Sequence, residues 1–403
     1  MTSDAAAARR PPADRCPGVL RLIEAADGHL ARVRLPGGFV TAAQLRALAR
    51  LAGEMGDDRI ELTSRGNVQL RALAPDAAAR LTDELSAAGL LPSLDHDRVR
   101  NVLASPLAGL DEGLDLAPVV RALDAGLCAR PRLAELSGRF LFAIDDGRGD
   151  VAGLGADVVA VVAAGEASVN GLAVSEPDPS PDHVAAVMLA FAETFLDERA
   201  SLGSPAWRVA DLPGGAGRVR AVVAERLGLT AARTPGTSTT APATSAIRPV
   251  GIISGRGVAD GDERHRPVQR GAPAVVLLAP LGRLTVGQAG WLADRAGGRA
   301  ARVTPWRSVV LPDQAEAAGV LRAAAGLGLG VDAASPWLRV TACAGKPGCA
   351  SALADVQADA EGFAARWPGR IVHVSGCARH CGRPAATEVD VTATSMGYEV
   401  AGA

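Results

Sequence analysis

Four of the six cysteines stand close together near the C-terminal end of the chain, in two pairs. Cys343 and Cys349 are separated by five residues, and Cys377 and Cys381 by three. Four thiolates are the usual donor set for a [4Fe–4S] cluster. Glycine and proline residues surround both pairs, so that the backbone can turn tightly and direct amide groups at the cluster sulfides. The pattern predicts that all four cysteines bind one iron–sulfur cluster.

A structural zinc site is the main alternative for these cysteines. Such sites commonly use short Cys-x2–4-Cys spacings, and only the pair Cys377 and Cys381 has a spacing in that range. Unrelated free thiols are a third alternative. The two remaining cysteines, Cys16 and Cys128, stand alone, and we expect them to be buried as small apolar residues.

The charge of the chain argues against nucleic-acid binding as its main role. Its 42 Lys and Arg residues nearly balance 44 Asp and Glu, and the only lysine is Lys346. No block of basic residues typical of a nucleic-acid-binding arm occurs. The N-terminal stretch lacks the apolar core of a secretory signal, and no apolar run reaches the roughly 18 residues that cross a bilayer. We therefore expect a cytoplasmic protein without nucleic-acid or membrane partners.

The chain contains an internal repeat. The segment from Leu35 to Arg50, which begins Leu-Pro-Gly-Gly, is echoed from Pro280 to Asp294. Both segments predict a strand end, a glycine turn and a helix capped by a threonine, Thr41 or Thr285. A strand should follow each helix, over residues 59–71 and 301–311. The unit is therefore strand, helix, strand, and a chance similarity of two such units is the alternative to duplication.

A stretch with almost no large apolar side chain divides the chain into two halves. Residues 233–249 are rich in Thr, Ser, Pro and Ala, and predict an exposed linker. Each half begins with one copy of the repeat. Further elements expected from the pattern are helices over 76–88 and 181–196, a strand over 139–144, and buried strands over 158–164 and 274–278.

Beyond these patterns, the sequence resembles the sulfite and nitrite reductase family. The resemblance rests on the two cysteine pairs, the two Leu-Pro-Gly-Gly-type segments and the string Leu62-Thr-Ser-Arg-Gly-Asn-Val-Gln69. Within the family, further strings are most similar to the branch that acts on precorrins in aerobic cobalamin biosynthesis. These strings are Arg15-Cys-Pro-Gly-Val-Leu-Arg21, Phe142-Ala-Ile-Asp-Asp-Gly147 and residues 342–355, and the resemblance extends from about Cys16 to Pro384.

The resemblance implies an α+β, duplicated nitrite/sulfite reductase-like fold. Two ferredoxin-like half-domains and two larger α/β domains would be arranged about a pseudo-twofold axis, with the cluster and a tetrapyrrole at their interface. The half-domains would cover residues 16–78 and 250–315, and the linker residues 233–249. The first α/β domain, residues 90–232, would contact the tetrapyrrole. The second α/β domain, residues 330–403, would carry the cysteines.

The resemblance also implies an oxidoreductase. The reaction would be the oxygen-dependent hydroxylation of precorrin-3A at a ring carbon, with closure of an acetate side chain to a γ-lactone. Reducing equivalents would come from NADH. No Gly-x-Gly-x-x-Gly stands between a strand and a helix at the proper distance from an acidic residue, so we expect the electrons to arrive through a separate reductase or ferredoxin.

Arginines are the expected readers of the substrate, because a precorrin carries several carboxylates and the planar guanidinium matches a carboxylate well. Arg307 in the second repeat most nearly mirrors Arg65 in the first. A solvated surface charge is the alternative for each arginine. Where the reductases have a second basic residue near Arg139, this chain has Leu141. The residues that match the family's tetrapyrrole-carboxylate contacts are Arg65, Arg100 and Arg139. Beside them lie Asn67, Gln69 and Asn101, which we expect to bind the substrate as neutral donors.

Two histidines flank the last cysteine pair. A mononuclear non-haem iron that activates oxygen would need nitrogen or oxygen ligands, which His373 and His380 offer. The alternative is that His373 packs in a strand and that His380 lies on the cysteine loop without a ligand role. Two further functions stay open at this point, a sirohaem-dependent nitrite or sulfite reductase and a non-catalytic metal-binding scaffold. The less basic surroundings of Leu141 speak against the reductase.

Overall fold

The computed structural model describes residues 14, 16–110, 114–163, 165–174, 179–232, 250–253 and 272–402. The expected linker, residues 233–249, lies outside them.

Two five-stranded sheets each take one strand from the other half of the chain. The first sheet has the order β1 (Ile23–Ala25), β2 (Gly28–Val33), β5 (Val68–Leu73), β4 (Arg59–Leu62) and β13 (Arg283–Thr285). The second has the order β11 (Gly251–Ile253), β12 (Ala274–Leu278), β15 (Ser308–Leu311), β14 (Ala301–Val303) and β3 (Phe39–Val40). Because β13 pairs with β4 and β3 pairs with β14, each half completes the sheet of the other.

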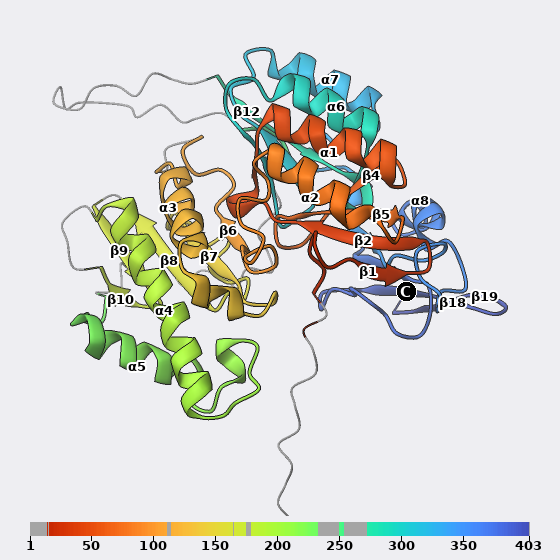
Figure 1. The fold of residues 1–403 in the computed structure, drawn as a ribbon. Helices are drawn as coiled ribbons and strands as arrows, with labels where there is room; N and C mark the ends of the chain where they lie inside the picture. Colours follow the sequence, from red (N-terminus) through yellow and green to blue (C-terminus); the bar gives the residue numbers. More distant parts are fainter. Residues whose placement is uncertain are drawn as a thin grey trace, which may run out of the picture.

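Four helices cover these two sheets, and together they enclose one shared core. They are α1 (Ala42–Met55), α2 (Ala77–Ala87), α6 (Val286–Arg295) and α7 (Ala317–Gly326). Figure 1 shows them as one layer, with α1 beside α6. Leu48 and Leu51 of α1 and Leu292 of α6 are fully buried in a single apolar cluster. The two half-domains therefore share one apolar core.

The repeat continues into the hydrogen bonds at both ends of the helices. Thr41 and Thr285 cap α1 and α6, and in each case the glutamine three residues later completes a capping box. Each glutamine also donates through Nε2 to a carbonyl after the next helix, from Gln44 to Ala88 and from Gln288 to Leu327. Both halves thus have the same threonine cap, the same capping box and the same glutamine contact, which confirms the predicted repeat.

Two further sheets share one pattern of strand directions. One contains β6 (Val102–Ala104), β7 (Phe142–Asp145), β8 (Val158–Ala163), β9 (Glu166–Val169) and β10 (Leu172–Ala173). The other contains β16 (Val340–Ala342), β17 (Val372–Ser375), β18 (Val389–Thr394) and β19 (Gly397–Ala401). In both, the first three strands run parallel and the fourth pairs antiparallel with the third. The duplication therefore includes these larger domains.

Helices complete both of the larger domains. Those of the first are α3 (Ala117–Cys128), α4 (Pro181–Ser201) and α5 (Gly215–Leu227), and α8 (Val356–Arg366) belongs to the second. Short 3-10 turns lie at Pro36–Gly38, Pro131–Glu135, Val209–Asp211, Pro280–Gly282 and Pro336–Leu338. The first domain has a large apolar core that includes Phe140, Phe142 and Phe195, whereas the core of the second consists mainly of valine and alanine.

Most of the predicted elements occur close to their expected places, but two strands do not. The helices predicted over 76–88 and 181–196 are α2 and α4, and the buried strands are β8 and β12. The single strands predicted over 59–71 and 301–311 are wrong, because each is a hairpin of two strands. Gly66 in the first turn and Arg307 in the second have positive φ angles, of 64° and 62°, which reverse the chain.

No helix in the described part of the chain is both long and apolar enough to span a membrane.

Candidate functional site

The cysteines lie where two parallel strands end. Cys343 directly follows β16, and Cys377 follows β17 by two residues. The strands pair in register, with Thr341 opposite His373. Directly after the last paired residue of β16, the amide of Cys343 donates to the carbonyl of Val374 at 3.0 Å. The sheet thus brings the two cysteine pairs, which are distant in sequence, to one edge.

The local contacts of these cysteines fit a thiolate-bound group. The amide of Gly376 donates to Sγ of Cys343 at 3.1 Å, which is the kind of hydrogen bond that tunes a cluster sulfur. A side chain at Gly376 would come within 2.8 Å of Cβ of Ala352, so only glycine lets the two loops approach this closely. All four thiols are free; Cys381 is exposed and the other three are half-buried.

The first half-domain fixes one end of the loop from Cys343 to Cys349. Arg71 on β5 donates through Nη2 to the carbonyl of Gly348 at 3.0 Å, and Asp27 pairs with the same guanidinium at 3.0 and 3.1 Å. Only 9% of the Arg71 side chain and 12% of the Asp27 side chain are exposed. A buried ion pair therefore holds the backbone next to Cys349.

A second contact of the same kind fixes the other end of that loop. Gln357 on α8 donates to the carbonyl of Cys343 at 3.2 Å and accepts from Arg283. Arg283 on β13 pairs in turn with Asp57 at 2.7 Å. Both ends of the loop are thus connected to aspartates of the first half-domain.

The two histidines differ in their surroundings. His373 is fully buried in β17, and its Nδ1 is 2.8 Å from the hydroxyl of Thr341. Burial lowers its pKa to about 4, and the charge of Arg307 acts in the same direction. His380 lies on the cysteine loop, 3.1 Å from Asp390, which also pairs with Arg383. These positions match the alternative of a packing residue and a loop residue, and an iron site at these histidines stays a prediction.

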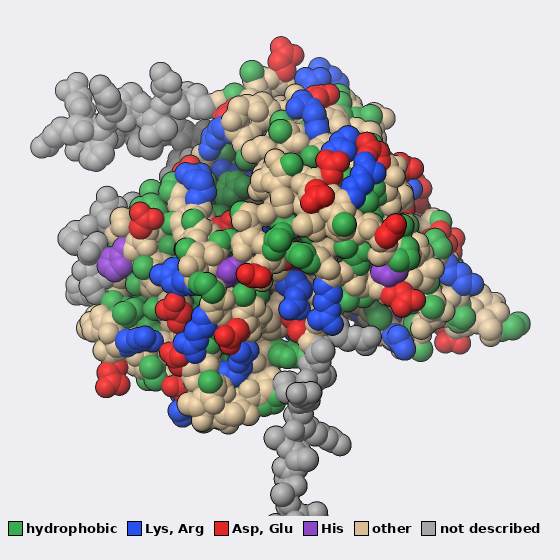
Figure 2. All heavy atoms as spheres, in the orientation of Figure 1, with side chains coloured by type: hydrophobic (Ala, Val, Ile, Leu, Met, Phe, Trp, Pro, Cys, Tyr) green, Lys and Arg blue, Asp and Glu red, His purple; other side chains and the backbone are tan. Residues whose placement is uncertain are grey.

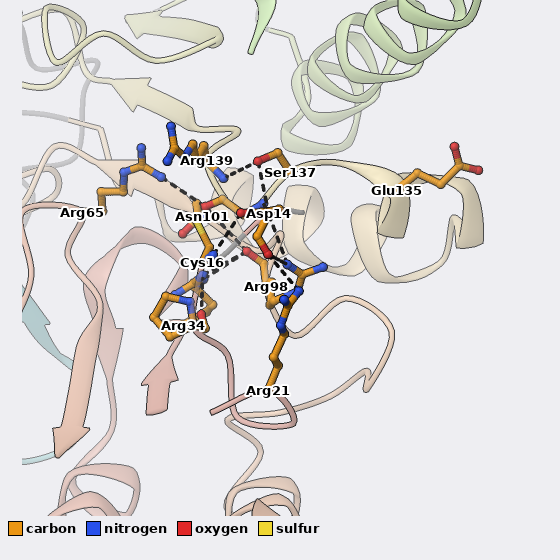
Figure 3. Close-up of polar contacts among 12 residues, drawn as sticks. Asp14, Cys16, Arg21, Arg34, Arg65, Arg98, Asn101, Glu135, Ser137 and Arg139 are labelled. Carbon is orange, nitrogen blue, oxygen red and sulfur yellow. Dashed lines mark hydrogen bonds and ion pairs between the residues drawn. The ribbon is translucent and has the colours of Figure 1, made fainter. Parts of the chain in front are cut away.

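A second group of predicted residues gathers between the first half-domain and the first α/β domain. Arg65, in the turn between β4 and β5, donates to the carbonyl of Gly138 at 3.3 Å, as drawn in Figure 3. Burial, followed by the positive charges of Arg208 and Arg139, lowers the pKa of Arg65. Arg139 lies over the ring of Trp207 at 4.3 Å, and Arg208 pairs with Asp157 at 3.0 Å. The guanidinium groups of Arg139 and Arg208 therefore both lie close enough to Arg65 to affect its charge.

The segment that precedes β1 closes one side of this region (Figure 3). Asp14 accepts from the amide of Gly138 at 2.7 Å and pairs with Arg98 at 3.2 Å. Cys16 is only half-buried, and burial together with Asp14 raises the pKa of its thiol. Arg34 donates to the carbonyls of Pro17 and Arg98, each through Nη2 at 3.3 and 3.1 Å.

Four of the predicted residues are engaged in contacts within the fold. Arg100 is only 4% exposed and forms a bidentate pair with Asp124, with both N–O distances 2.7 Å. Asn67 and Asn101 are buried and bonded to each other. Gln69 accepts from Arg32 and donates to Glu61. These contacts position the walls of the site, and a direct role of the four in binding substrate stays a prediction.

Arg307 belongs to the cysteine side of the molecule. It lies in the turn between β14 and β15, which corresponds to the turn of Arg65, and not within a strand as predicted. Its charge reaches His373 in β17. The two turns of the repeat thus direct one arginine toward each larger domain.

Arg34 and Arg208 were not predicted from the sequence. Arg34 directly precedes the first Leu-Pro-Gly-Gly segment, so its position beside a repeated motif was the available signal. Arg208 comes from the irregular segment between α4 and α5, and no pattern in the sequence marks it.

Three acidic residues form the one compact group of possible metal ligands in the described part of the chain. These are Asp145, Asp146 and Asp150. Asp145 already accepts four backbone hydrogen bonds, two on each oxygen. Asp146 pairs with Arg148. The carboxylates of Asp145 and Asp146 therefore already have partners within the protein.

Residues 23–88 match the family model described as the nitrite/sulfite reductase ferredoxin-like half domain. The solved structure of the Mycobacterium tuberculosis NirA protein superposes with a TM-score of 0.69 over 92% of this chain and 73% of that one, at 22% identity. The duplicated α+β fold predicted from the sequence is thereby confirmed. The first half-domain is thus similar to that of nitrite and sulfite reductases, and the fold of the whole chain is similar to that of NirA.

Along nearly its whole length, the chain is similar to precorrin-3B synthase from Sinorhizobium sp.. The two are 28% identical over 99% of this chain and 84% of the relative. Similarity to the ferredoxin–nitrite reductase of Synechococcus elongatus is more local, at 36% identity over 30% of this chain and 25% of that one. The sulfite reductase [ferredoxin] of Mycobacterium tuberculosis is 34% identical over 30% of this chain and 22% of its own.

Proposed function

We propose that the protein is a precorrin-3B synthase. It would hydroxylate precorrin-3A at a ring carbon and close an acetate side chain to a γ-lactone. One atom of O₂ enters the product and the other leaves as water, with two electrons supplied by NADH. The observation that carries the proposal is the extent of the similarity, which covers 99% of the chain for a precorrin-3B synthase but 30% for the reductases.

The arginines near the first α/β domain support a polycarboxylate substrate. After the effect of burial, the positive charges of Arg208 and Arg139 disfavour the charged form of Arg65 and lower its pKa. Carboxylates of a bound tetrapyrrole would relieve this repulsion through charge-assisted hydrogen bonds. Trp207 holds Arg139 by a cation–π contact and fixes its direction.

Leu141 supports a tetrapyrrole that is substrate and not sirohaem. It is 3% exposed and packs with Leu103, Ala143 and Val151. The place where the family's reductases have a second basic residue is therefore part of an apolar core. A small anion such as nitrite or sulfite would find one cation fewer there.

Cys343, Cys349, Cys377 and Cys381 would hold a [4Fe–4S] cluster. When bound, the cluster supplies one-electron transfer. The chain's own part is to hold the ligands at the strand ends and to present a basic surface near the exposed Cys381. Lys346, Arg379 and Arg383 are exposed on these loops, which suits an acidic donor protein that passes electrons from NADH.

The experiment is a turnover assay with the cluster-loaded protein, precorrin-3A, a reduced ferredoxin-type donor and isotopically labelled O₂. We expect mass spectrometry to show one labelled oxygen atom in the product. An anaerobic absorption spectrum of the same sample should show a broad iron–sulfur shoulder without haem bands. No label in the product, together with sirohaem bands and consumption of nitrite or sulfite, would overturn the proposal in favour of a reductase.

A Trp207→Leu variant tests the arginine group separately. Loss of the cation–π contact should weaken binding of uroporphyrin, a stable octacarboxylate porphyrin, by about threefold to tenfold, because Arg139 becomes free to turn away. A Trp291→Leu variant, in which the ring that Arg295 overlies on α6 is removed, is the matched control. Equal uroporphyrin affinity in both variants would show that Arg139 does not contact the tetrapyrrole.

A further inference from the structure

A cavity of about 520 Å³ lies between α1, α3 and the segment before β14. Figure 2 shows the surface hollowed between α3 and α1 on the face drawn. The residues that carry the argument are Arg34, Leu35, Phe39, Val120, Arg121 and Arg299. We infer that this cavity binds a small organic anion, with a carboxylate or phosphate on a flat apolar body, at a site separate from the proposed tetrapyrrole site.

Positive charge exceeds negative charge in the lining. Five arginines line the cavity, but only two aspartates do, Asp115 and Asp124. Asp124 is occupied by its bidentate pair with Arg100. Arg299 has a loose contact with Asp313 at 3.6 Å, between side chains that are each 41% exposed. Such an exposed pair neutralises little of the charge.

Two of these arginines have donors without partners among the residues that the structure describes. Arg121 on α3 is exposed and forms no hydrogen bond or ion pair there. Arg34 is 2% exposed, and its Nη1 is buried without a hydrogen-bond partner. Burial, followed by the charge of Arg32, lowers the pKa of Arg34 to about 9. A buried donor of this kind is costly unless an acceptor satisfies it.

The remaining walls suit an apolar body. Leu35, Phe39 and Val120 line the cavity between the charged groups. The volume is in the range of roughly 300–1,000 Å³ that small-molecule sites occupy. The helices α1 and α3 both begin at the cavity, at Thr41 and Ala117, so their positive ends add to the potential there.

The cavity is distinct from the region of the proposed function. Arg65, Arg139 and Arg307 do not line it, whereas Arg34 lies between the two, with Nη2 donating to the carbonyls of Pro17 and Arg98 on the side of that region. Arg100 does, but Asp124 takes up both edges of its guanidinium. The inference therefore goes beyond the proposed reaction, and variants at Arg121 and Ala117, which the cavity does not share with that region, test it separately.

The test is calorimetric titration of the full-length protein with adenosine monophosphate and with isophthalate. The first probe carries a phosphate and the second carboxylates, each on an aromatic body, and the tighter of the two identifies the preferred anion. An Arg121→Gln variant should raise the Kd of that probe by about tenfold, as loss of one charge-assisted hydrogen bond does. Arg220→Gln is the matched control, because Arg220 is an exposed helical arginine of the same domain outside the cavity.

A second variant keeps the test independent of one side chain. Ala117→Trp places a large ring in the cavity and should abolish probe binding, while binding of uroporphyrin stays within twofold of the wild type. Failure of both probes to bind the wild type would overturn the inference, and so would binding that neither variant changes. Competition between uroporphyrin and the probe, with loss of both in Arg121→Gln, would assign the cavity to the tetrapyrrole and would also overturn it.

Discussion

The two larger sheets have the same strand directions, but the loops at their ends are chemically opposite. In the first domain, Ser105 follows β6 and Asp145 ends β7. In the second, Cys343 follows β16 and Cys377 comes shortly after β17. These are equivalent places in the repeat, since β6 pairs with β7 as β16 pairs with β17.

In the first domain these polar groups satisfy one another. The hydroxyl of Ser105 is 2.5 Å from Asp150, and the carboxylate of Asp145 accepts from four backbone amides. In the second domain, Sγ of Cys343 accepts one hydrogen bond within the described part of the chain, from the amide of Gly376. The comparison teaches that one copy of the scaffold closes its loops with internal hydrogen bonds, whereas the other leaves thiols for an external group.

The largest expected effect is loss of that external group. A Cys343→Ser variant should contain almost no iron or acid-labile sulfide, against about four of each per chain in the wild type, because a cubane needs its thiolate ligands. Iron and sulfide analysis of the protein purified without air measures this. Cys128→Ser, at the end of α3, should keep the full complement. A full cluster in Cys343→Ser, or stoichiometric zinc in the wild type, would contradict the assignment.

The next effect concerns the loop that closes itself. Asp145→Ala leaves four backbone amides without their acceptor and should lower the free energy of unfolding by about 3 kcal/mol. Urea unfolding of the protein measures the change. Asp83→Ala removes an exposed carboxylate of α2 and should change it by less than about 0.5 kcal/mol. Equal stability of the two variants would mean that the loop does not depend on Asp145.

This contrast also shows what sequence reasoning reaches. The cysteine pairs were readable because their spacing and glycines reflect local backbone demands, and Gly376 indeed lies where a side chain would collide with Ala352. The repeat was readable from its threonine caps. The exchange of β3 and β13 was not, because both strands are very short and pair with residues more than 200 positions away.

The arginines show the same limit. Arg65 and Arg100 were both predicted because they match carboxylate contacts of the family. Only the tertiary structure shows that Asp124 neutralises Arg100, whereas Arg65 lies near the positive charges of Arg208 and Arg139. Asp124 is a residue of α3, and nothing in the local sequence connects it with Arg100. Charge neutralisation across domains is therefore the part of a site that a motif does not encode.

A smaller effect tests the acidic loop by pH. Burial, followed by the charges of Asp145 and Asp146, raises the pKa of Asp150 to about 6, while Ser105 acts in the opposite direction. Because the folded-state pKa lies above the ordinary value of 3.8, folding favours the protonated form, and stability falls as pH rises from about 4 to above 6.

Asp150→Asn removes this titration. Its unfolding free energy should equal that of the wild type near pH 4 and exceed it by about 1.5 kcal/mol at pH 7, with allowance for partial exposure. Urea unfolding across this pH range measures the difference. Asp83→Asn, a change of the same kind on an exposed side chain, should follow the wild type at every pH. A constant offset between Asp150→Asn and the wild type would show that burial does not perturb Asp150.

The smallest effect compares the two copies of the repeat directly. Thr41 and Thr285 each accept from the amide of the glutamine three residues later, at 3.2 and 3.1 Å. Thr41→Ala and Thr285→Ala should therefore each cost about 1 kcal/mol of stability. The double variant should lose the sum, within about 0.5 kcal/mol, because the two caps do not share a hydrogen-bond partner. Because α1 and α6 pack into one core, both losses of stability should appear in a single urea unfolding transition. Two separate transitions would mean that the half-domains unfold independently despite the exchanged strands.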